Sequence, residues 1–444
     1  MKARFLAIVA LIVLGVVVFI SAVSSDASRV SEYKKYIKTA ETNAEKGIPY
    51  IAVNNYKSAF KIKTPNEETY IKYLEQTKLL GEDYYKDAVE GFVSACPESA
   101  KAYDLLCDYY SEAGNEDKLL KTAIEAKNKG LASGKIKELY FKTFYDYDIV
   151  RGGFEEASSL LGKYARIMKN GKYGFIQSNG NTLIEPEYNK ASFLLDSSIA
   201  VCDESGWYMI NTSGYKVAVP EKPVDELNMI SNGRILLKVG QKYDYTDKSM
   251  KIPKELRFDN ATNFKNSVAA VKQNGKWALL GSDNKFITKY IFEDIIIDEF
   301  NTCINNGVIF AKSEGKYYMY NAEGKKISKT AFDNAYPFAS EDYAAVCVGG
   351  KWGFADSEGN ITIEPQFDEA KSFSCNIAPV KINGKWGYMS KSKQTDENGK
   401  ETGYIFRIEA EFDDCRPFSS GGIAAVKTGE TWEYIELKGY SINN

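Results

Sequence analysis

The spacing of apolar and polar residues changes twice along the chain, which divides it into three segments. Phe5 to Val23 forms an apolar run in which Ser21 is the only polar residue. From Ser28, apolar and small residues recur three and four positions apart, as in helices that bury one face. From residue 164, they occur in short runs between glycine-containing turns, as in β-strands. The pattern predicts a multidomain protein of α plus all-β class, with domains at residues 1–27, 28–163 and 164–444.

The first segment predicts a transmembrane helix that acts as a signal anchor. A helix over Phe5 to Val23 would be about 28 Å long, close to the roughly 30 Å of a bilayer's hydrocarbon core. Lys2 and Arg4 precede it, which places the remaining domains outside the cytoplasm. The alternative is a signal peptide cleaved in the small residues that follow, which would give a secreted protein.

The second segment predicts helical hairpins. Before the turn at Gly114, one predicted buried stripe consists of Tyr103, Leu106, Cys107 and Tyr110. After the turn, a second stripe consists of Leu119, Ala123 and Ala126. This spacing resembles the tetratricopeptide repeat, in which large residues of a first helix pack over small ones of a second. Similar offsets occur from Ala52 to Ala95. They recur at Phe141, Phe144, Gly152, Ala157 and Leu161, which extends this tetratricopeptide-like domain to residue 163.

The third segment repeats one aromatic position eight times, at spacings between 34 and 46 residues. The eight residues, which include all five tryptophans, are Tyr173, Trp207, Tyr243, Trp277, Tyr317, Trp352, Trp386 and Trp432. In the clearest copy, an apolar strand at Tyr343 precedes a glycine turn and the strand Trp352-Gly353-Phe354. There the glycine allows a neighbouring backbone to approach closely. A further strand follows, and Phe367-Asp368 ends the unit.

These units resemble the WG-repeat family, named for its Trp-Gly pair. "KWGF" at Lys351, "KWGY" at Lys385 and "IEP" at Ile184 and Ile363 carry the resemblance. The pair is replaced at Trp207-Tyr208, Trp277-Ala278, Tyr317-Tyr318 and Trp432-Glu433, where the close backbone approach is not assured. The resemblance implies a tandem β array in bacterial proteins and implies no catalytic residue.

Eight units predict a closed β-propeller, and an open β-solenoid is the alternative. Closure would remove the sheet edges that an open stack exposes. The segment Phe154 to Ala157 resembles Phe367 to Ala370 and could complete the ring, but it fits the helical repeat equally well.

Composition argues against an enzyme. The chain has no histidine, which removes the usual general base and the zinc sites built on imidazole. The seven cysteines are dispersed without a CxxC pair, and 57 basic against 60 acidic residues disfavour nucleic acid as a partner. We therefore predict no catalytic residue, no cofactor and no metal.

Two groups of polar residues recur with the repeat, and we interpret both as structural. The acids Glu185, Glu364 and Glu409 are predicted to cap turns, as are the acids that follow the aromatic at the end of a unit: Asp259, Glu293, Asp333, Asp368 and Asp413. Cys202 and Cys347 lie five residues before a repeat tryptophan and are predicted to act as small buried hydrophobic residues.

The predicted function is that of a non-enzymatic, membrane-anchored scaffold of the bacterial cell envelope that binds a protein or peptide. The alternative is a cell-wall or carbohydrate-binding module that uses exposed aromatics. Specificity would reside where the chain departs from the repeat, at Asp298 to Asn306 and Ser390 to Gly403. Both insertions are interpreted as solvated loops, with recognition loops as the alternative.

Overall fold

The computed structural model describes residues 27–195, 198–395 and 401–441. They form two compact units, one ending at Thr143 and the other beginning at Phe144. The predicted transmembrane helix, Phe5 to Val23, lies outside the described residues.

The predicted fold class needs a correction in its membrane element. Among the described residues, no helix is long and apolar enough to cross a bilayer. The helices between residues 49 and 144 have at most 14 residues, whereas a span needs about 20 apolar ones. The class that the structure supports is helical repeats followed by a closed β-propeller.

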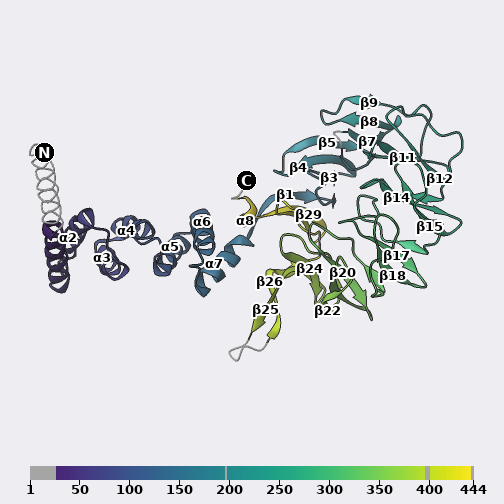
Figure 1. The fold of residues 1–444 in the computed structure, drawn as a ribbon. Coiled ribbons are helices and arrows are strands. Elements are labelled where there is room, and N and C mark those ends of the chain that lie inside the picture. The colour runs from purple at the N-terminus through teal and green to yellow at the C-terminus, as the bar shows by residue number, and fades with distance from the viewer. Residues whose placement is uncertain (1–26, 196–197, 396–400, 442–444) are drawn as a thin grey trace, which may run out of the picture. The chain divides into compact units, whose positions relative to one another are not determined.

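Successive helices pack side by side in the first unit (Figure 1). After a helical stretch over residues 27–45 come α2 (Pro49–Ile62), α3 (Glu67–Leu80), α4 (Glu82–Ala95), α5 (Ala100–Glu112), α6 (Glu116–Asn128) and α7 (Gly134–Phe144). Side chains of Asn66, Ser99 and Asn115 accept hydrogen bonds from the first turns of α3, α5 and α6. These caps satisfy backbone N–H groups that have no partner within the helix.

The predicted helical stripes are confirmed. All four stripe residues of α5 and all three of α6 are buried. Buried tyrosines pack closely at the centre of the array, with the Tyr70 and Phe92 rings stacked 4.6 Å apart between centroids. The region is therefore consistent with a tetratricopeptide-like helical domain.

The last predicted helical repeat is wrong, because the chain turns from helix to strand after Phe144. Strand β1 (Tyr147–Phe154) follows α7 directly. Its β-branched residues and the pair Gly152-Gly153 disfavour helix. Ala157 lies in a strand as well, so the structure separates the two units at Thr143 rather than at residue 163.

The described residues from Phe144 onward form eight sheets, the blades of a propeller (Figure 1). Blade 1 consists of β2 (Glu156–Ala157), β3 (Tyr164–Lys169), β4 (Lys172–Gln177) and β5 (Thr182–Tyr188), and blade 2 of β6 (Lys190–Ala191), β7 (Ser198–Asp203), β8 (Gly206–Asn211) and β9 (Lys216–Ala218). Blade 3 consists of β10 (Glu226–Ser231), β11 (Arg234–Val239) and β12 (Lys242–Thr246), and blade 4 of β13 (Asn260–Ala261), β14 (Val268–Gln273) and β15 (Lys276–Gly281).

Blades 5 to 8 complete the ring. Blade 5 consists of β16 (Asp294–Ile295), β17 (Ile309–Ser313) and β18 (Lys316–Tyr320), and blade 6 of β19 (Asn334–Ala335), β20 (Tyr343–Val348), β21 (Lys351–Asp356) and β22 (Ile361–Phe367). Blade 7 consists of β23 (Glu369–Ala370), β24 (Ile377–Ile382), β25 (Lys385–Thr395) and β26 (Glu401–Phe412), and blade 8 of β27 (Asp414–Cys415), β28 (Ile423–Thr428), β29 (Thr431–Leu437) and β1. A short helix, α8 (Lys438–Ser441), follows. The insertion Ser390 to Gly403 lengthens the hairpin β25–β26, and its tip at 396–400 lies outside the described residues.

The propeller core lies between neighbouring blades. In blade 2, Figure 1 shows β9 at the rim with β8 and β7 successively further in, and the short first strand β6 pairs with β7 on its inner side. Between blades 1 and 2, for example, Phe175 and Ile184 pack against Ile199 and Val201. Each blade therefore depends on its neighbours for the burial of its apolar faces.

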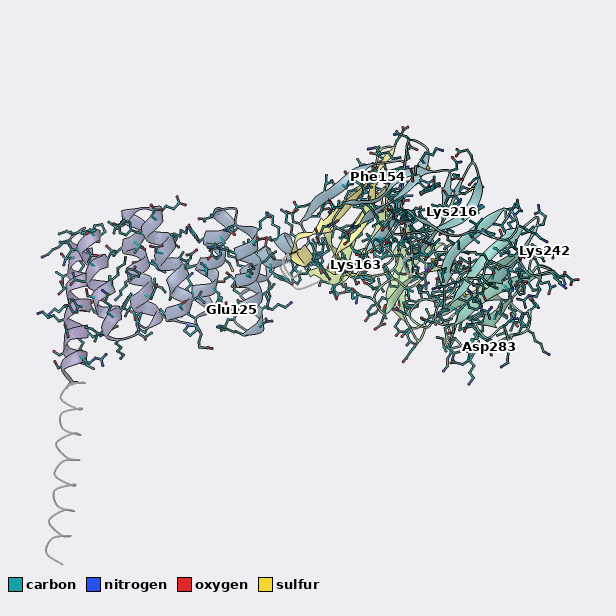
Figure 2. The ribbon with its side chains drawn as sticks, turned by 90° about the horizontal axis from the view of Figure 1, so that it is seen from above. Glu125, Phe154, Lys163, Lys216, Lys242 and Asp283 are labelled. Carbon is teal, nitrogen blue, oxygen red and sulfur yellow. The ribbon has the colours of Figure 1, made fainter. Side chains whose placement is uncertain are left out.

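Strand β1 closes the ring. It pairs antiparallel with β29, and Phe154 lies opposite Trp432. Figure 2 shows Phe154 among the strands of the propeller. Phe154 and Tyr434 of blade 8 share one buried cluster with Ala157 and Ile167 of blade 1. The closed propeller is thus confirmed over the open solenoid, and Phe154 to Ala157 belongs to the ring.

The glycine beside the repeat aromatic determines whether a fourth strand pairs fully. A Cβ atom at Gly174 would lie 2.7 Å from the Ile184 carbonyl oxygen. Blades 1, 6 and 7, which have this glycine, have a fourth strand that reaches the aromatic. In the described residues of blades 3, 4 and 5, Asp244, Ala278 and Tyr318 replace it, and only isolated bridges form there.

Blade 8 solves the same steric problem on the opposite strand. Glu433 replaces the glycine of the Trp-Gly pair, and Gly152 of β1 lies opposite it. A Cβ atom at Gly152 would lie 2.9 Å from the Glu433 Cβ atom. The close approach that the sequence left unassured in this unit therefore occurs.

Acids that follow the aromatic at the end of a unit, such as Asp259 after Phe258, join consecutive blades. They also accept hydrogen bonds from hairpin turns, which confirms their predicted role at turns. Asp259 accepts a hydrogen bond from Lys242 Nζ of blade 3 at 2.6 Å and from the Asn274 N–H in the hairpin of blade 4 at 2.8 Å. Asp333 and Asp413 make the same pair of contacts between blades 5 and 6 and between blades 7 and 8. Hydrogen bonds from lysine lower the pKa of all three carboxyl groups.

Replacement of Phe154 with Ala is expected to destabilise the propeller by about 3–5 kcal/mol, because a large buried aromatic is lost where the ring closes. Urea unfolding followed by tryptophan fluorescence measures this, since all five tryptophans lie in the propeller. Ile149→Ala, on the same strand but 61% exposed, is the control and should change the free energy of unfolding by less than about 0.5 kcal/mol. Equal effects would contradict closure by β1.

Low pH should weaken the hydrogen bonds that Asp259, Asp333 and Asp413 form between consecutive blades. Because the folded-state pKa of Asp259, Asp333 and Asp413 is lowered, their stabilising contribution is present above the unfolded pKa of about 3.9. It is lost as the pH falls through the lowered folded value. Thermal unfolding between pH 6 and 3 should therefore show a steeper loss of stability in the wild type than in the triple Asp→Asn variant.

A second triple variant controls for net charge. Glu185, Glu364 and Glu409 are exposed residues on the outer strands, so their replacement with Gln removes the same number of carboxylates. This variant should keep the acid sensitivity of the wild type. A loss of that sensitivity in both variants would show that total charge, and not the inter-blade contact, is responsible.

Candidate functional site

The eight repeat aromatics are part of the core rather than a binding platform. Trp277, Tyr317, Trp386 and Trp432 are buried. The other four are half-buried, and each packs against a hydrophobic cluster between blades. The four buried rings leave no face open for a sugar, and the four half-buried rings keep only part of their surface exposed.

The other repeated polar residues have structural surroundings too. Glu185, Glu364 and Glu409 lie on the exposed face of outer strands, so their predicted role as turn caps is wrong. Cys202 and Cys347 lie opposite Trp207 and Trp352 in the strand register. Cys347 is buried as predicted, whereas Cys202 is half-buried.

The insertion around Asp298 to Asn306 is not a solvated loop, and this corrects the first interpretation. It joins β16 to β17 at the inner edge of blade 5. Residues 302–305 are buried, and residues 296–301 are partly buried. We call residues 296–305 the axial plug.

The axial plug contacts inner loops of blades all around the ring. Its Phe300 ring meets the Phe193 ring of blade 2 edge to face, with 5.0 Å between centroids. The Asn263 N–H of blade 4 donates to the Asn301 carbonyl oxygen at 2.7 Å. Glu299 accepts a hydrogen bond from the Ser159 N–H of blade 1 at 3.1 Å. Since blades 1 and 5 are opposite each other in an eight-membered ring, the plug crosses the propeller axis.

Asp298 holds the plug in its fold. Its carboxylate accepts hydrogen bonds from the Thr302 N–H at 2.7 Å, the Thr302 hydroxyl at 2.6 Å and the Asn305 amide at 3.2 Å. Lys265 Nζ lies 3.9 Å from the same carboxylate and donates to Asn305 at 2.5 Å. The plug is thus fixed by its own hydrogen bonds before any ligand binds.

A cavity of about 500 Å³ lies beside the plug, and we call it the axial cavity. Its walls come from the plug, from the inner loops of blades 1, 6 and 8, and from Lys265 of blade 4. Most of them are apolar, with Leu160, Ile296, Ile297, Phe338, Pro417 and Phe418 as the main contributors. Gly162, Ser340 and Ser420 are the exposed residues of its lining and form the rim. A mainly apolar concavity with a few polar groups is typical of ligand sites.

Two ion pairs line the axial cavity, Lys265–Asp298 and Arg416–Glu299. Arg416 Nε lies 4.0 Å from Glu299 Oε2, and the two side chains are 27% and 22% exposed. Burial opposes the charged form of Arg416, but Glu299 and neighbouring groups raise the pKa of its guanidinium overall. Arg416 therefore stays charged, although its Nε is buried and makes no hydrogen bond to any described residue.

A smaller cavity of about 240 Å³, lined by residues of blades 3 and 4, is less suited to a ligand. Asp244 and Arg257 line it and bond to each other in a bidentate pair, with N–O distances of 2.7 and 2.8 Å. Asp244 also accepts from the backbone of Tyr245 and Arg257, so its hydrogen-bonding capacity is used within the protein.

The axial cavity contains both charged and apolar groups. Within the described parts of the chain, no three acids or cysteines come close enough to hold a metal ion. The cavity offers a guanidinium, an ammonium group, two carboxylates and apolar walls, which can orient a bound group. The predicted absence of a catalytic residue, cofactor and metal stays a prediction.

Sequence reasoning missed Glu299 and Arg416, and only one signal pointed towards them. The spacing of 40 residues between Trp277 and Tyr317 marked an insertion in blade 5. Nothing in the repeat pattern indicated that the insertion runs inwards to the axis rather than outwards into solvent.

Comparisons with known proteins agree with the repeat. The family described as "WG containing repeat" matches residues 173–201, 245–277, 319–352, 352–386 and 406–432. No curated protein matches the chain.

Solved structures resemble the chain only weakly. Kluyveromyces lactis Hsv2 is 9% identical, with 60% of this chain and 98% of that one covered and a TM-score of 0.36. A crystal structure of the eukaryotic initiation factor is 12% identical over 63% of this chain and 83% of that one, with a TM-score of 0.40. These values give no ground for transferring a function. The family matches, in contrast, all fall on the propeller and follow its repeated aromatic, and the chain therefore belongs to the WG-repeat family.

Proposed function

We propose that this protein is a non-enzymatic interaction scaffold, whose propeller binds a protein or peptide partner at the axial cavity. The supporting observation is the combination of apolar walls with the Glu299–Arg416 pair, at the place where the chain departs from its repeat. Loops that differ between units can change without loss of strand pairing, so binding surfaces arise there. A WG-repeat propeller is a suitable module for protein interaction.

The rival functions have less support. Carbohydrate binding through the repeat aromatics has no geometric basis, because those rings pack into the core. The extracytoplasmic location stays a prediction that rests on residues 1–25, which lie outside the described residues.

Replacement of Ala339 with Trp should fill the axial cavity, because Ala339 lines it beside Phe338. Partners captured by the wild-type chain from an extract of the source organism are identified by mass spectrometry and then titrated by calorimetry. The variant should weaken binding of such a partner roughly tenfold or more, since an indole would occupy the space of the ligand. Glu358→Trp, in an exposed turn of the same blade, is the control and should bind normally.

Three results would contradict the proposal. Equal binding by the wild type and both variants would place the interaction elsewhere. Binding of purified cell-wall glycan that survives Ala339→Trp would favour the carbohydrate alternative. Turnover of a peptide or polysaccharide that Glu299→Gln abolishes without unfolding the protein would show that the protein is an enzyme.

A further inference from the structure

The axial cavity has more unused hydrogen-bond donors than acceptors. The Arg416 guanidinium has five N–H groups, and its contact with Glu299 at 4.0 Å is longer than a hydrogen bond. Its Nε is buried and unpartnered among the described residues. Because Nε has no access to solvent, an acceptor from outside the chain reaches this guanidinium through its terminal nitrogens, on a side chain that is 27% exposed and stacks over the Trp432 ring at 5.0 Å.

The acidic side chains of the cavity already use more of their hydrogen-bonding capacity within the protein than Arg416 does. Asp298 accepts four hydrogen bonds within the plug, and Glu299 accepts one from the Ser159 N–H. Lys265, the other cation of the lining, donates to Asn305 and lies near Asp298. The unused capacity is therefore mainly that of Arg416, which favours an anionic ligand group over a cationic one. Guanidinium and carboxylate match well, because both are planar and can form two parallel hydrogen bonds.

The apolar walls and the plug limit the rest of the ligand. A volume of about 500 Å³ beside Leu160, Phe338 and Phe418 holds one or two apolar residues and excludes a folded domain. Because the plug fills the axis with buried residues such as Thr302 and Ile304, a chain cannot thread through the propeller. A site of this kind suits the end of a chain, which enters past the rim at Ser340 and Ser420.

We infer that the axial cavity binds the carboxyl terminus of a partner protein. The terminal carboxylate accepts hydrogen bonds from Arg416, and the last apolar side chain packs against Leu160, Phe338 and Phe418. This inference rests on the proposed function and specifies the partner's chemistry. Glu299 holds the guanidinium in place through its ion pair, and its own charge opposes that of the incoming carboxylate.

The first test uses the wild-type full chain, so it does not depend on any variant folding. Fluorescein-labelled random hexapeptides ending in Leu, Ile, Val or Phe are prepared as free acids and as carboxyl-terminal amides, and binding is measured by fluorescence anisotropy. The free acids should bind about tenfold to a hundredfold more tightly than the amides, as expected for a hydrogen-bonded charge pair. Equal binding of acids and amides, or no binding by either, would overturn the inference.

Variants then assign the contact to Arg416. Arg416→Gln should abolish the difference between acid and amide, Arg416→Lys should restore part of it, and Glu299→Gln should tighten binding of the free acid. Arg234→Gln, which removes one arginine from the separate cavity lined by blades 3 and 4, is the matched control and should retain the difference. Thermal unfolding of each variant verifies its fold. A preference for the free acid that persists in a folded Arg416→Gln would overturn the assignment.

Two further outcomes separate this inference from the proposed function. Octanoate serves as an apolar carboxylate that is not a peptide, and displacement of the hexapeptides by octanoate at equal affinity would assign the cavity to a fatty acid. If Ala339→Trp abolishes partner binding but no free-acid hexapeptide binds, the proposed function stands and this inference fails. If hexapeptides bind but Ala339→Trp leaves partner binding unchanged, the proposed function fails instead.

Discussion

The antiparallel pairing of β1 with β29 is the contact on which the propeller depends. Each blade buries its apolar faces against two neighbours, so a ring with one open joint would expose the faces of blades 1 and 8. The axial plug depends on the same closure. Its contacts with Ser159 and Arg416 come from those two blades, and they form only when the blades stand side by side. The cavity is therefore a product of the closed ring rather than of any single blade.

The features that the sequence predicts well are local or repeated ones. The stripe of α5 at Tyr103 and Leu106 was predictable, because a helix places residues three and four apart on one face. The strands of the propeller were predictable from a unit that occurs eight times. The same unit contains a finer rule for blades 1, 6 and 7, where a glycine next to the aromatic, as at Gly174 or Gly353, accompanies a closely paired fourth strand.

The remaining features depend on contacts between distant residues. The pattern around Phe154 and Ala157 fits a helix or a strand, and only pairing with β29 at the far end of the chain decides between them. Glu299 meets Ser159 across 140 residues, and neither stands out in its own segment. The structure also corrects two interpretations for a physical reason. The plug is buried because the axis of an eight-bladed ring leaves space to fill, and Glu185 is exposed because it lies on an outer strand.

Because blade 8 combines strands from both ends of the propeller sequence, the ring can close only late in synthesis of the chain. The Tyr434 hydroxyl donates a hydrogen bond to the Ser158 carbonyl oxygen across 276 residues. The contacts that close the ring therefore join the earliest and the latest parts of the propeller to leave the ribosome. Helices α2 to α6 pack against their neighbours in sequence and can fold during translation, whereas the propeller must wait for β29. Until then β1 has no strand to pair with, and a chain that stops before Thr431 would have all its other blades but an unsealed ring.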